Sequence, residues 1–212
     1  MRLRKVKNAL ESLRAYPAYF IDSPLEFKGN WKEVFQNDHP IHIEIGCGKG
    51  QFISQLAALN PEINYLAIEK YDSVLLRAAE KLEDQTLPNL RLILWDANRI
   101  EEIFAEHEIS LIYINFSDPW PKSAHKKRRL TYKTFLKQYE VILEPEGKIC
   151  QKTDNRQLFA FSIESFNENG WLLSNITLDL HADEVFNIQT EFEEKWSKLG
   201  PIYRLEATKR RG

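Results

Sequence analysis

Residues 41–51 read IHIEIGCGKGQ and run directly into a helix-like apolar stretch that ends at Leu59. A short apolar strand, a turn with three glycines and a helix start therefore follow one another without a gap. Glycines let the backbone approach a ligand closely, and the free N–H groups of a helix's first turn add positive partial charge. This stretch predicts the first strand–turn–helix unit of an α/β fold, with a ligand at the turn.

Two details of the turn separate it from a dinucleotide site. Position 51 is Gln, so the last glycine of a G-x-G-x-x-G pattern is absent. Glu44 precedes the first glycine by two residues, where its charge would repel a pyrophosphate and attract the amino group and sulfonium of S-adenosylmethionine. The alternative is a buried strand carboxylate satisfied by a neighbouring cation or backbone N–H. We favour the ligand.

Strand and helix patterns alternate along the rest of the chain. Strands are expected at 41–45, 64–69, 90–95, 110–116, 147–153, 171–179 and 202–209, and helices at 51–59, 72–85, 100–107, 131–143, 156–169 and 191–199. This alternation predicts an α/β fold with a mostly parallel seven-stranded sheet and helices on both faces. We expect one domain over residues 1–212, with a basic N-terminal extension over about 1–30.

Acidic residues end the expected strands. Glu69 lies where nucleotide folds place an acid on the ribose hydroxyls, and Asp96 and Asp118 follow the next two strands. Glu69 or Asp96 alone is at least as well explained as a helix cap. Four such acids, counting Glu44, are better explained by a ligand site, because ligands bind at the carboxyl ends of parallel strands.

Asp118 lies in the sequence SDPWPK (117–122), just before the basic run HKKRR (125–129). Prolines restrict their own φ and push the preceding residue toward extended geometry, so we expect Asp118 and Trp120 to be held in defined directions. A fixed carboxylate beside a dense cationic run suggests chemistry on a polyanion.

With these motifs, the chain resembles the class I S-adenosylmethionine-dependent methyltransferases, and the fuller pattern is similar to the bacterial tRNA (guanine-N7-)-methyltransferase family. The matching pieces are EIGCGKG (44–50), Ile68 with Glu69, NFSDPWPK (115–122) with HKKRRL (125–130), KTDN (152–155) and TEFE (190–193). The resemblance implies a Rossmann-like class I methyltransferase fold with an antiparallel C-terminal hairpin.

The resemblance also implies roles for individual residues. Asp118 would be catalytic, and Glu44, Gly46, Gly48, Glu69, Asp96 and Asp118 would bind S-adenosylmethionine, whose product is S-adenosylhomocysteine. Lys122, Asp154, Thr190, Glu191, Phe192 and Glu193 would bind the substrate, and Ala124, His125, Lys126, Lys127, Arg128 and Arg129 the RNA. Alternatives exist, because Thr190 with Glu193 is also a capping box and Asp154 also suits a helix cap.

Composition agrees with an RNA-acting enzyme. The net charge is −2, yet segments 1–14, 122–129 and 204–211 hold 14 of the 29 Lys and Arg residues and only two acids, which predicts a cationic face on an acidic body. Cys47, Cys150 and five scattered histidines show no ligand spacing, so we expect no metal. The basic N-terminus lacks an apolar segment, and no apolar run approaches a membrane span, so we expect a cytoplasmic protein. We expect it to be a monomer or a homodimer.

The sequence and the resemblance together predict methyl transfer to N7 of a guanine in tRNA, in the variable loop, giving 7-methylguanosine. N7 carries a free lone pair, so the reaction needs positioning more than a strong base. Asp118 would stabilise the developing charge or orient the guanine edge. The alternatives are an RNA methyltransferase that acts on an exocyclic amine and a non-catalytic RNA-binding module.

Overall fold

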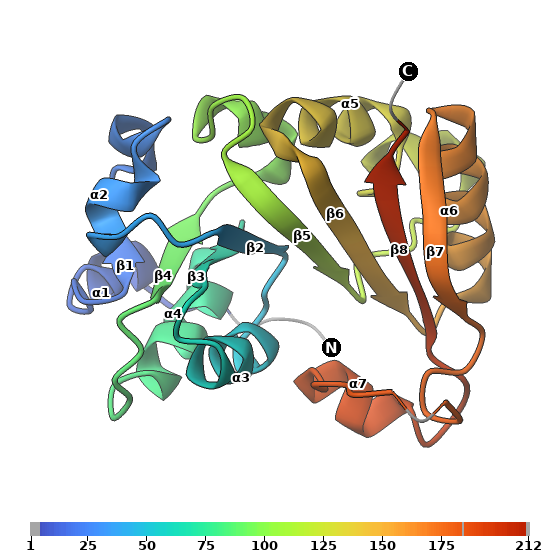
Figure 1. Ribbon diagram of the computed structural model, residues 1–212. Helices are drawn as coiled ribbons and strands as arrows, with labels where there is room; N and C mark the ends of the chain where they lie inside the picture. The colour runs from blue at the N-terminus through green and yellow to red at the C-terminus, as the bar shows by residue number, and fades with distance from the viewer. Residues whose placement is uncertain (1–4, 184, 211–212) are drawn as a thin grey trace. The chain divides into compact units, whose positions relative to one another are not determined.

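The computed structural model describes residues 5–183 and 185–210, which form two compact units, Met1–Ala105 and Glu106–Gly212 (Figure 1). Residues 1–4 of the expected basic extension and Arg211 lie outside the described residues. The one-domain organisation stays a prediction. Each unit contains four strands among its described residues.

The first unit is a parallel sheet in the order β1-β4-β3-β2. Its strands are β1 (Phe20–Ile21), β2 (Ile41–Ile45), β3 (Asn64–Glu69) and β4 (Leu90–Leu94), and its helices are α1 (Ala9–Leu13), η1 (Pro24–Phe27), α2 (Trp31–Phe35), α3 (Gln51–Leu59), α4 (Asp72–Lys81) and η2 (Ala97–Glu102). All six residues of β3 are buried, as expected for a strand inside a parallel sheet.

The segment expected as a basic extension contributes to the first unit. Ala9 and Leu13 of α1 are buried, and β1 pairs in parallel with β4. Directly after this segment, Trp31 of α2 is fully buried and donates from Nε1 to the Ile103 carbonyl over 2.8 Å. The buried side chains of α1 and the pairing of β1 with β4 thus tie the segment to the first unit although it is partly cationic.

The second unit is a mixed sheet in the order β5-β6-β8-β7 (Figure 1). Its elements are β5 (Ile109–Asn115), η3 (Ser123–Arg128), α5 (Lys133–Ile142), β6 (Leu143–Thr153), α6 (Arg156–Glu168), β7 (Trp171–Thr177), α7 (Glu191–Trp196) and β8 (Tyr203–Lys209). β5 and β6 are parallel, while β8 is antiparallel to both β6 and β7. The expected C-terminal hairpin is confirmed.

α6 covers one face of the second unit's sheet. Phe159 stacks on Tyr203 at a centroid distance of 5.1 Å, and Phe166 meets Trp171 edge-on at 5.9 Å. Because directly paired antiparallel residues share a face, Gln151 and Leu205 lie on this same side of the sheet. Lys152, the next residue of β6, therefore projects from the opposite face.

The α/β fold class is confirmed, and the described residues form one strand more than the seven expected, because β1 is added. Several boundaries differ from expectation. β6 begins at Leu143 rather than at 147, and α7 ends at Trp196 rather than at 199. The helix expected at 100–107 is the 3-10 helix η2, which begins after Asp96. The helix expected at 72–85 ends at Lys81, and β7 ends at Thr177, near an irregular register and the left-handed Asn175 (φ 48°).

Candidate functional site

The glycine turn connects β2 to α3 and has the backbone that its sequence requires. Gly46, Gly48 and Gly50 all have positive φ, at 78°, 59° and 77°. A Cβ on Gly46 or Gly48 would meet no atom within 4 Å, whereas a Cβ on Gly50 would come within 3.2 Å of the Ala78 Cβ. Gly50 thus packs the turn against α4, while open space lies beside Gly46 and Gly48.

Glu69, at the end of β3, holds this turn in place. One carboxylate oxygen accepts from the Gly48 N–H over 3.3 Å, and the other accepts from the Lys70 and Tyr71 N–H groups over 2.8 and 3.1 Å. Glu69 is only 7% exposed. Burial raises the pKa of this carboxyl, and the three backbone hydrogen bonds oppose that rise.

Two further groups near the turn are buried. Glu44 is 1% exposed at the end of β2. Burial, together with the charges of Glu44 and Glu69, raises the pKa of the Cys47 thiol well above its ordinary value. Two buried acidic side chains, Glu44 and Glu69, thus lie close to Cys47 in the turn, and carboxylates at this position would suit a ligand with an amino group, a sulfonium and a ribose diol.

Asp96 is exposed and caps η2, since its Oδ1 accepts from the Asn98 N–H over 2.9 Å. In this structure Asp96 is therefore a helix cap, which is the alternative that the sequence also allowed. The cofactor role of Asp96 stays a prediction.

Asp118 lies beyond the carboxyl end of β5 and is exposed. Two non-glycine residues with left-handed backbone flank it, Phe116 (φ 50°) and Trp120 (φ 42°). The expectation that Pro121 would hold Trp120 extended is wrong. Arg129 holds the loop instead, by donating to the Pro119 and Trp120 carbonyls, each over 3.0 Å.

The basic run 125–129 lies in η3 up to Arg128, with Arg129 directly after the helix, and its side chains differ in their surroundings. Lys126, Lys127 and Arg128 are exposed, and the Arg128 guanidinium lies 4.8 Å from the Trp120 ring centroid. Arg129 is half-buried and lies over the Phe161 ring at 4.4 Å. Three cations of the run thus face solvent, while the guanidinium of Arg129 is engaged in holding the loop.

The predicted substrate residues also differ in exposure. Lys122 and Asp154 are exposed. Asp154 does not cap α6, because Asn155 does so by accepting from the Leu158 N–H over 2.8 Å. Its capping alternative is therefore wrong.

The 190–193 segment opens α7. The Thr190 hydroxyl caps the helix by accepting from the Glu193 N–H over 3.0 Å. Thr190 and Glu191 are half-buried, Phe192 is 40% exposed, and Glu193 is fully buried. Glu193 lies 2.6 Å from the Lys152 Nζ. Lys152 is the residue that sequence reasoning missed, although it lies in the KTDN motif.

Of the expected site residues, the first unit brings Glu44, Gly46, Gly48 and Glu69 together around one turn. The second unit carries Asp118, Lys122 and the basic run on one continuous segment after β5.

Within the described part of the chain, no group of three or more His, Cys, Asp or Glu side chains could hold a metal ion. Over the same residues, no helix is long and apolar enough to cross a membrane.

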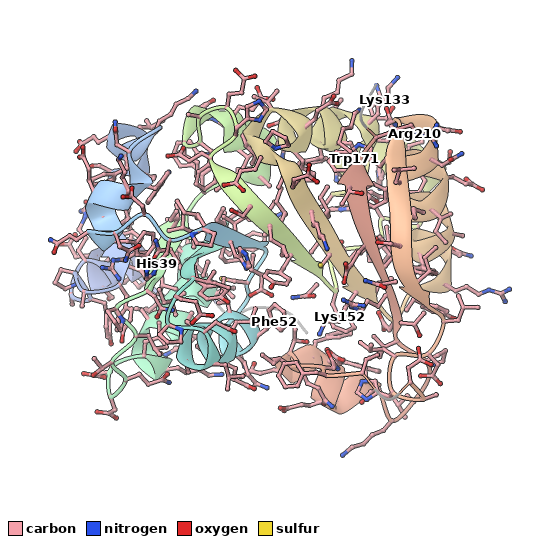
Figure 2. The ribbon with its side chains drawn as sticks, viewed as in Figure 1. His39, Phe52, Lys133, Lys152, Trp171 and Arg210 are labelled. Carbon is pink, nitrogen blue, oxygen red and sulfur yellow. The ribbon has the colours of Figure 1, made fainter. Side chains whose placement is uncertain are left out.

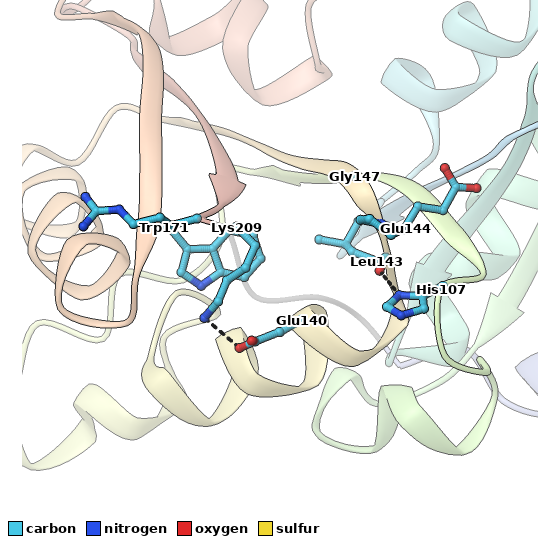
Figure 3. A pocket seen from close by; sticks show the side chains of 9 residues that line it. His107, Glu140, Leu143, Glu144, Gly147, Trp171 and Lys209 are labelled. Atoms are coloured by element: carbon cyan, nitrogen blue, oxygen red, sulfur yellow. Dashed lines mark hydrogen bonds and ion pairs between the residues drawn. The ribbon is translucent and has the colours of Figure 1, made fainter. Parts of the chain in front are cut away.

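A pocket of about 210 Å³ in the second unit lies apart from these residues (Figure 3). Its lining includes the start of β6 at Leu143 and the end of β8 at Lys209, far along the strands from the loop of Asp118. Lys209 is paired with Glu140 over 2.9 Å, and His107 Nδ1 lies 2.8 Å from the Leu143 carbonyl. No predicted site residue lines this pocket.

Comparisons with known proteins find similar methyltransferases. A family model described as "Putative methyltransferase" matches residues 38–205. A tRNA (guanine-N(7)-)-methyltransferase of Brevibacillus brevis is 51% identical over 98% of both chains, and one of Streptococcus mutans is 54% identical over 98% of this chain and 99% of its own.

Among solved structures, the 16S rRNA methyltransferase KamB has a TM-score of 0.67 at 14% identity, covering 91% of this chain and 95% of its own. An antibiotic-related methyltransferase has a TM-score of 0.61 at 17% identity, covering 84% and 91%. These structures share the fold.

Proposed function

The chain belongs to the tRNA (guanine-N7-)-methyltransferase family, and on that basis we propose that it transfers a methyl group from S-adenosylmethionine to N7 of a guanine in the variable loop of tRNA. The strongest support is the similarity to such enzymes over 98% of the chain. We further propose that it acts in the cytoplasm.

The glycine turn would hold S-adenosylmethionine, which supplies an electrophilic methyl group. Gly46 and Gly48 leave the space, and Glu44 supplies negative charge for the amino group and sulfonium. Glu69 would accept from the ribose hydroxyls while keeping its bond to Gly48. Asp96 would add an acceptor at the next strand end.

In the reaction, the N7 lone pair forms a bond to the methyl carbon as the carbon–sulfur bond breaks. The electron pair of that bond stays on sulfur, giving S-adenosylhomocysteine, and the guanine ring gains positive charge. Asp118 would stabilise this charge or accept from the N–H donors of the guanine edge. No proton has to leave N7, so the step requires no general base.

The exposure of the predicted substrate side chains indicates which of them would contact the RNA. Lys122, Asp154 and Phe192 are exposed and would contact the guanine nucleotide, with Thr190 and Glu191 beside them. Lys126, Lys127 and Arg128 would bind phosphates, with Ala124 and His125 in the same helix. Arg129 would act mainly by holding the Asp118 loop.

Product identification tests the proposal. The protein is incubated with methyl-labelled S-adenosylmethionine and bulk tRNA, and the RNA is digested to nucleosides. We expect the label in 7-methylguanosine. Label in N2-methylguanosine or N6-methyladenosine would assign the enzyme to the exocyclic-amine class, and an RNA-binding protein that transfers no label would be a non-catalytic module.

A further inference from the structure

Three aromatic rings form a ladder in the second unit, next to the loop of Asp118. The Phe116 and Phe192 ring centroids are 5.0 Å apart, and those of Phe192 and Trp196 are 5.6 Å apart with an interplanar angle of 28°. Phe192 is 40% exposed and Trp196 is 38% exposed. Since Phe116 precedes Asp118 by two residues, the ladder extends from the catalytic loop into solvent.

A buried ion pair holds the helix that carries two of these rings. α7 has six residues, too few for a helix to be stable alone. Glu193, next to Phe192, pairs with Lys152 over 2.6 Å, with side chains that are 0% and 6% exposed. Figure 2 labels Lys152 at the end of β6. The ion pair thus fastens α7 to a strand of the sheet.

Further contacts fix the segment before α7 to the same pair. Lys152 Nζ also donates to the Ile188 carbonyl over 2.8 Å and to the Asn187 Oδ1 over 3.1 Å. The second oxygen of Glu193 accepts from Asn187 Nδ2 over 2.6 Å and lies 3.0 Å from His181 Nε2. A buried ion pair is seldom more stabilising than apolar residues of similar volume, so its use here points to geometry rather than stability.

The surroundings of the ladder suit a nucleobase. Lys195 Nζ lies 5.2 Å from the Trp196 ring centroid, and Lys198 follows α7, while Glu191 and Glu194 of the same helix are acidic. The ladder therefore lies among charges of both signs, with the cations at the end of α7 that carries Trp196. Proteins that bind unpaired nucleic acid combine exposed aromatic rings with neighbouring cations, because every base has a stacking face and every nucleotide a phosphate. A purely apolar partner would gain nothing from these cations.

We propose that Phe116, Phe192 and Trp196 form a stacking surface for an unpaired base of the RNA substrate. In this arrangement, Lys152 and Glu193 are positioning residues that hold α7 against the catalytic loop. Glu193 would therefore act through Phe192 rather than by touching the substrate. The inference rests on the proposed function in that it takes tRNA as the substrate.

Binding experiments on ring variants test the surface. Phe192→Leu and Trp196→Leu should each weaken tRNA binding on the order of tenfold, while calorimetry gives an unchanged affinity for S-adenosylmethionine. Phe192→Tyr keeps the ring and should bind tRNA like the wild type. Phe186→Leu is the matched control, because Phe186 is 85% exposed and stands outside the ladder.

Three outcomes would overturn the stacking surface. These are unchanged tRNA affinity in both ring variants, an equal loss in Phe186→Leu, or a change of oligomeric state with unchanged affinity, which would assign the ladder to a contact between two copies. Binding is measured without reference to the product, so a product other than 7-methylguanosine would refute the proposed function alone.

The positioning role needs a variant that folds. Lys152→Met alone leaves a buried charge, whereas Lys152→Met with Glu193→Leu replaces the pair by apolar side chains. We expect the double variant to fold and to bind cofactor normally, with a KM for tRNA raised several-fold and kcat retained. An unchanged KM for tRNA would show that the ion pair does not position the ladder.

Discussion

At the residue scale, the Asp118 loop is held by contacts that its sequence does not reveal. Phe116 and Trp120 adopt left-handed backbone, which costs about 1–3 kcal/mol for each such residue. The Arg129 guanidinium compensates by bonding two loop carbonyls. The direction of Asp118 therefore depends on this network more than on the prolines beside it.

Replacing Asp118 tests whether this carboxylate takes part in the reaction. Asp118→Ala should lower the single-turnover rate at saturating cofactor and tRNA on the order of a hundredfold, because a preorganised charge is lost. Thermal unfolding should be unchanged, since Asp118 is exposed. Glu83→Ala, at an exposed acid on another segment, is the control. A near-normal rate in Asp118→Ala would remove Asp118 from the mechanism.

Glu69 has two predicted tasks, to hold the glycine turn and to bind the ribose. Glu69→Gln keeps the shape but weakens the acceptors, so the affinity for S-adenosylmethionine should fall by about 1.5–3 kcal/mol. The affinity for tRNA should stay as it is. Unchanged cofactor binding in calorimetry would reduce Glu69 to a support of the turn.

At the element scale, the basic run 125–129 divides its cations between solvent and the protein's own loop. Lys126 and Lys127 are exposed, while Arg129 is bonded to Pro119 and Trp120. Neighbouring residues of one basic run therefore have different predicted roles. This division could not be predicted from the sequence, because a run of Lys and Arg does not reveal which side chain folds back.

The two roles predict different behaviour in salt. Lys126→Ala with Lys127→Ala should reduce the slope of log tRNA affinity against log salt by roughly 0.7–0.9 for each lost phosphate contact. Arg129→Ala should instead lower turnover and change the slope little. Equal slope changes from Arg129→Ala and from Lys126→Ala alone would show that Arg129 also faces the RNA.

The buried strands could be predicted from sequence because their apolar runs are continuous, as in β3 and β5. The short elements β1, η1 and α2 could not, since two to five residues carry no readable period. The expected strands at 41–45 and 64–69 have the bounds of β2 and β3, so the positions of Glu44 and Glu69 near the ends of these strands could also be predicted. Lys152 was missed because its partner, Glu193, lies 41 residues away, and only the folded chain brings them together.

At the scale of the whole molecule, burial of His42 in β2 couples stability to pH. Burial lowers the pKa of His42 from 6.5 to about 4. Between these values the unfolded chain binds a proton that the folded chain does not, so stability falls as pH drops below about 6.5. The share due to His42 should reach about 2 kcal/mol at pH 5.

Denaturant unfolding at pH 7.5 and pH 5 measures this effect. The wild type should lose more unfolding free energy on acidification than His42→Phe, which has no group to titrate at this position. The difference between the two losses isolates His42 from other titrating groups. Equal losses would show that His42 is accessible to protons in the folded state.

The most direct test of the account is to map the methylated position in intact tRNA. A methyl group on N7 gives the guanine a positive charge and weakens its imidazole ring, so borohydride reduction and aniline treatment cut the chain there. We predict cleavage at one guanine in the variable loop, only after incubation with protein and S-adenosylmethionine. A methylated tRNA that resists aniline would contradict N7 transfer, and cleavage at a guanine outside the variable loop would contradict the proposed position.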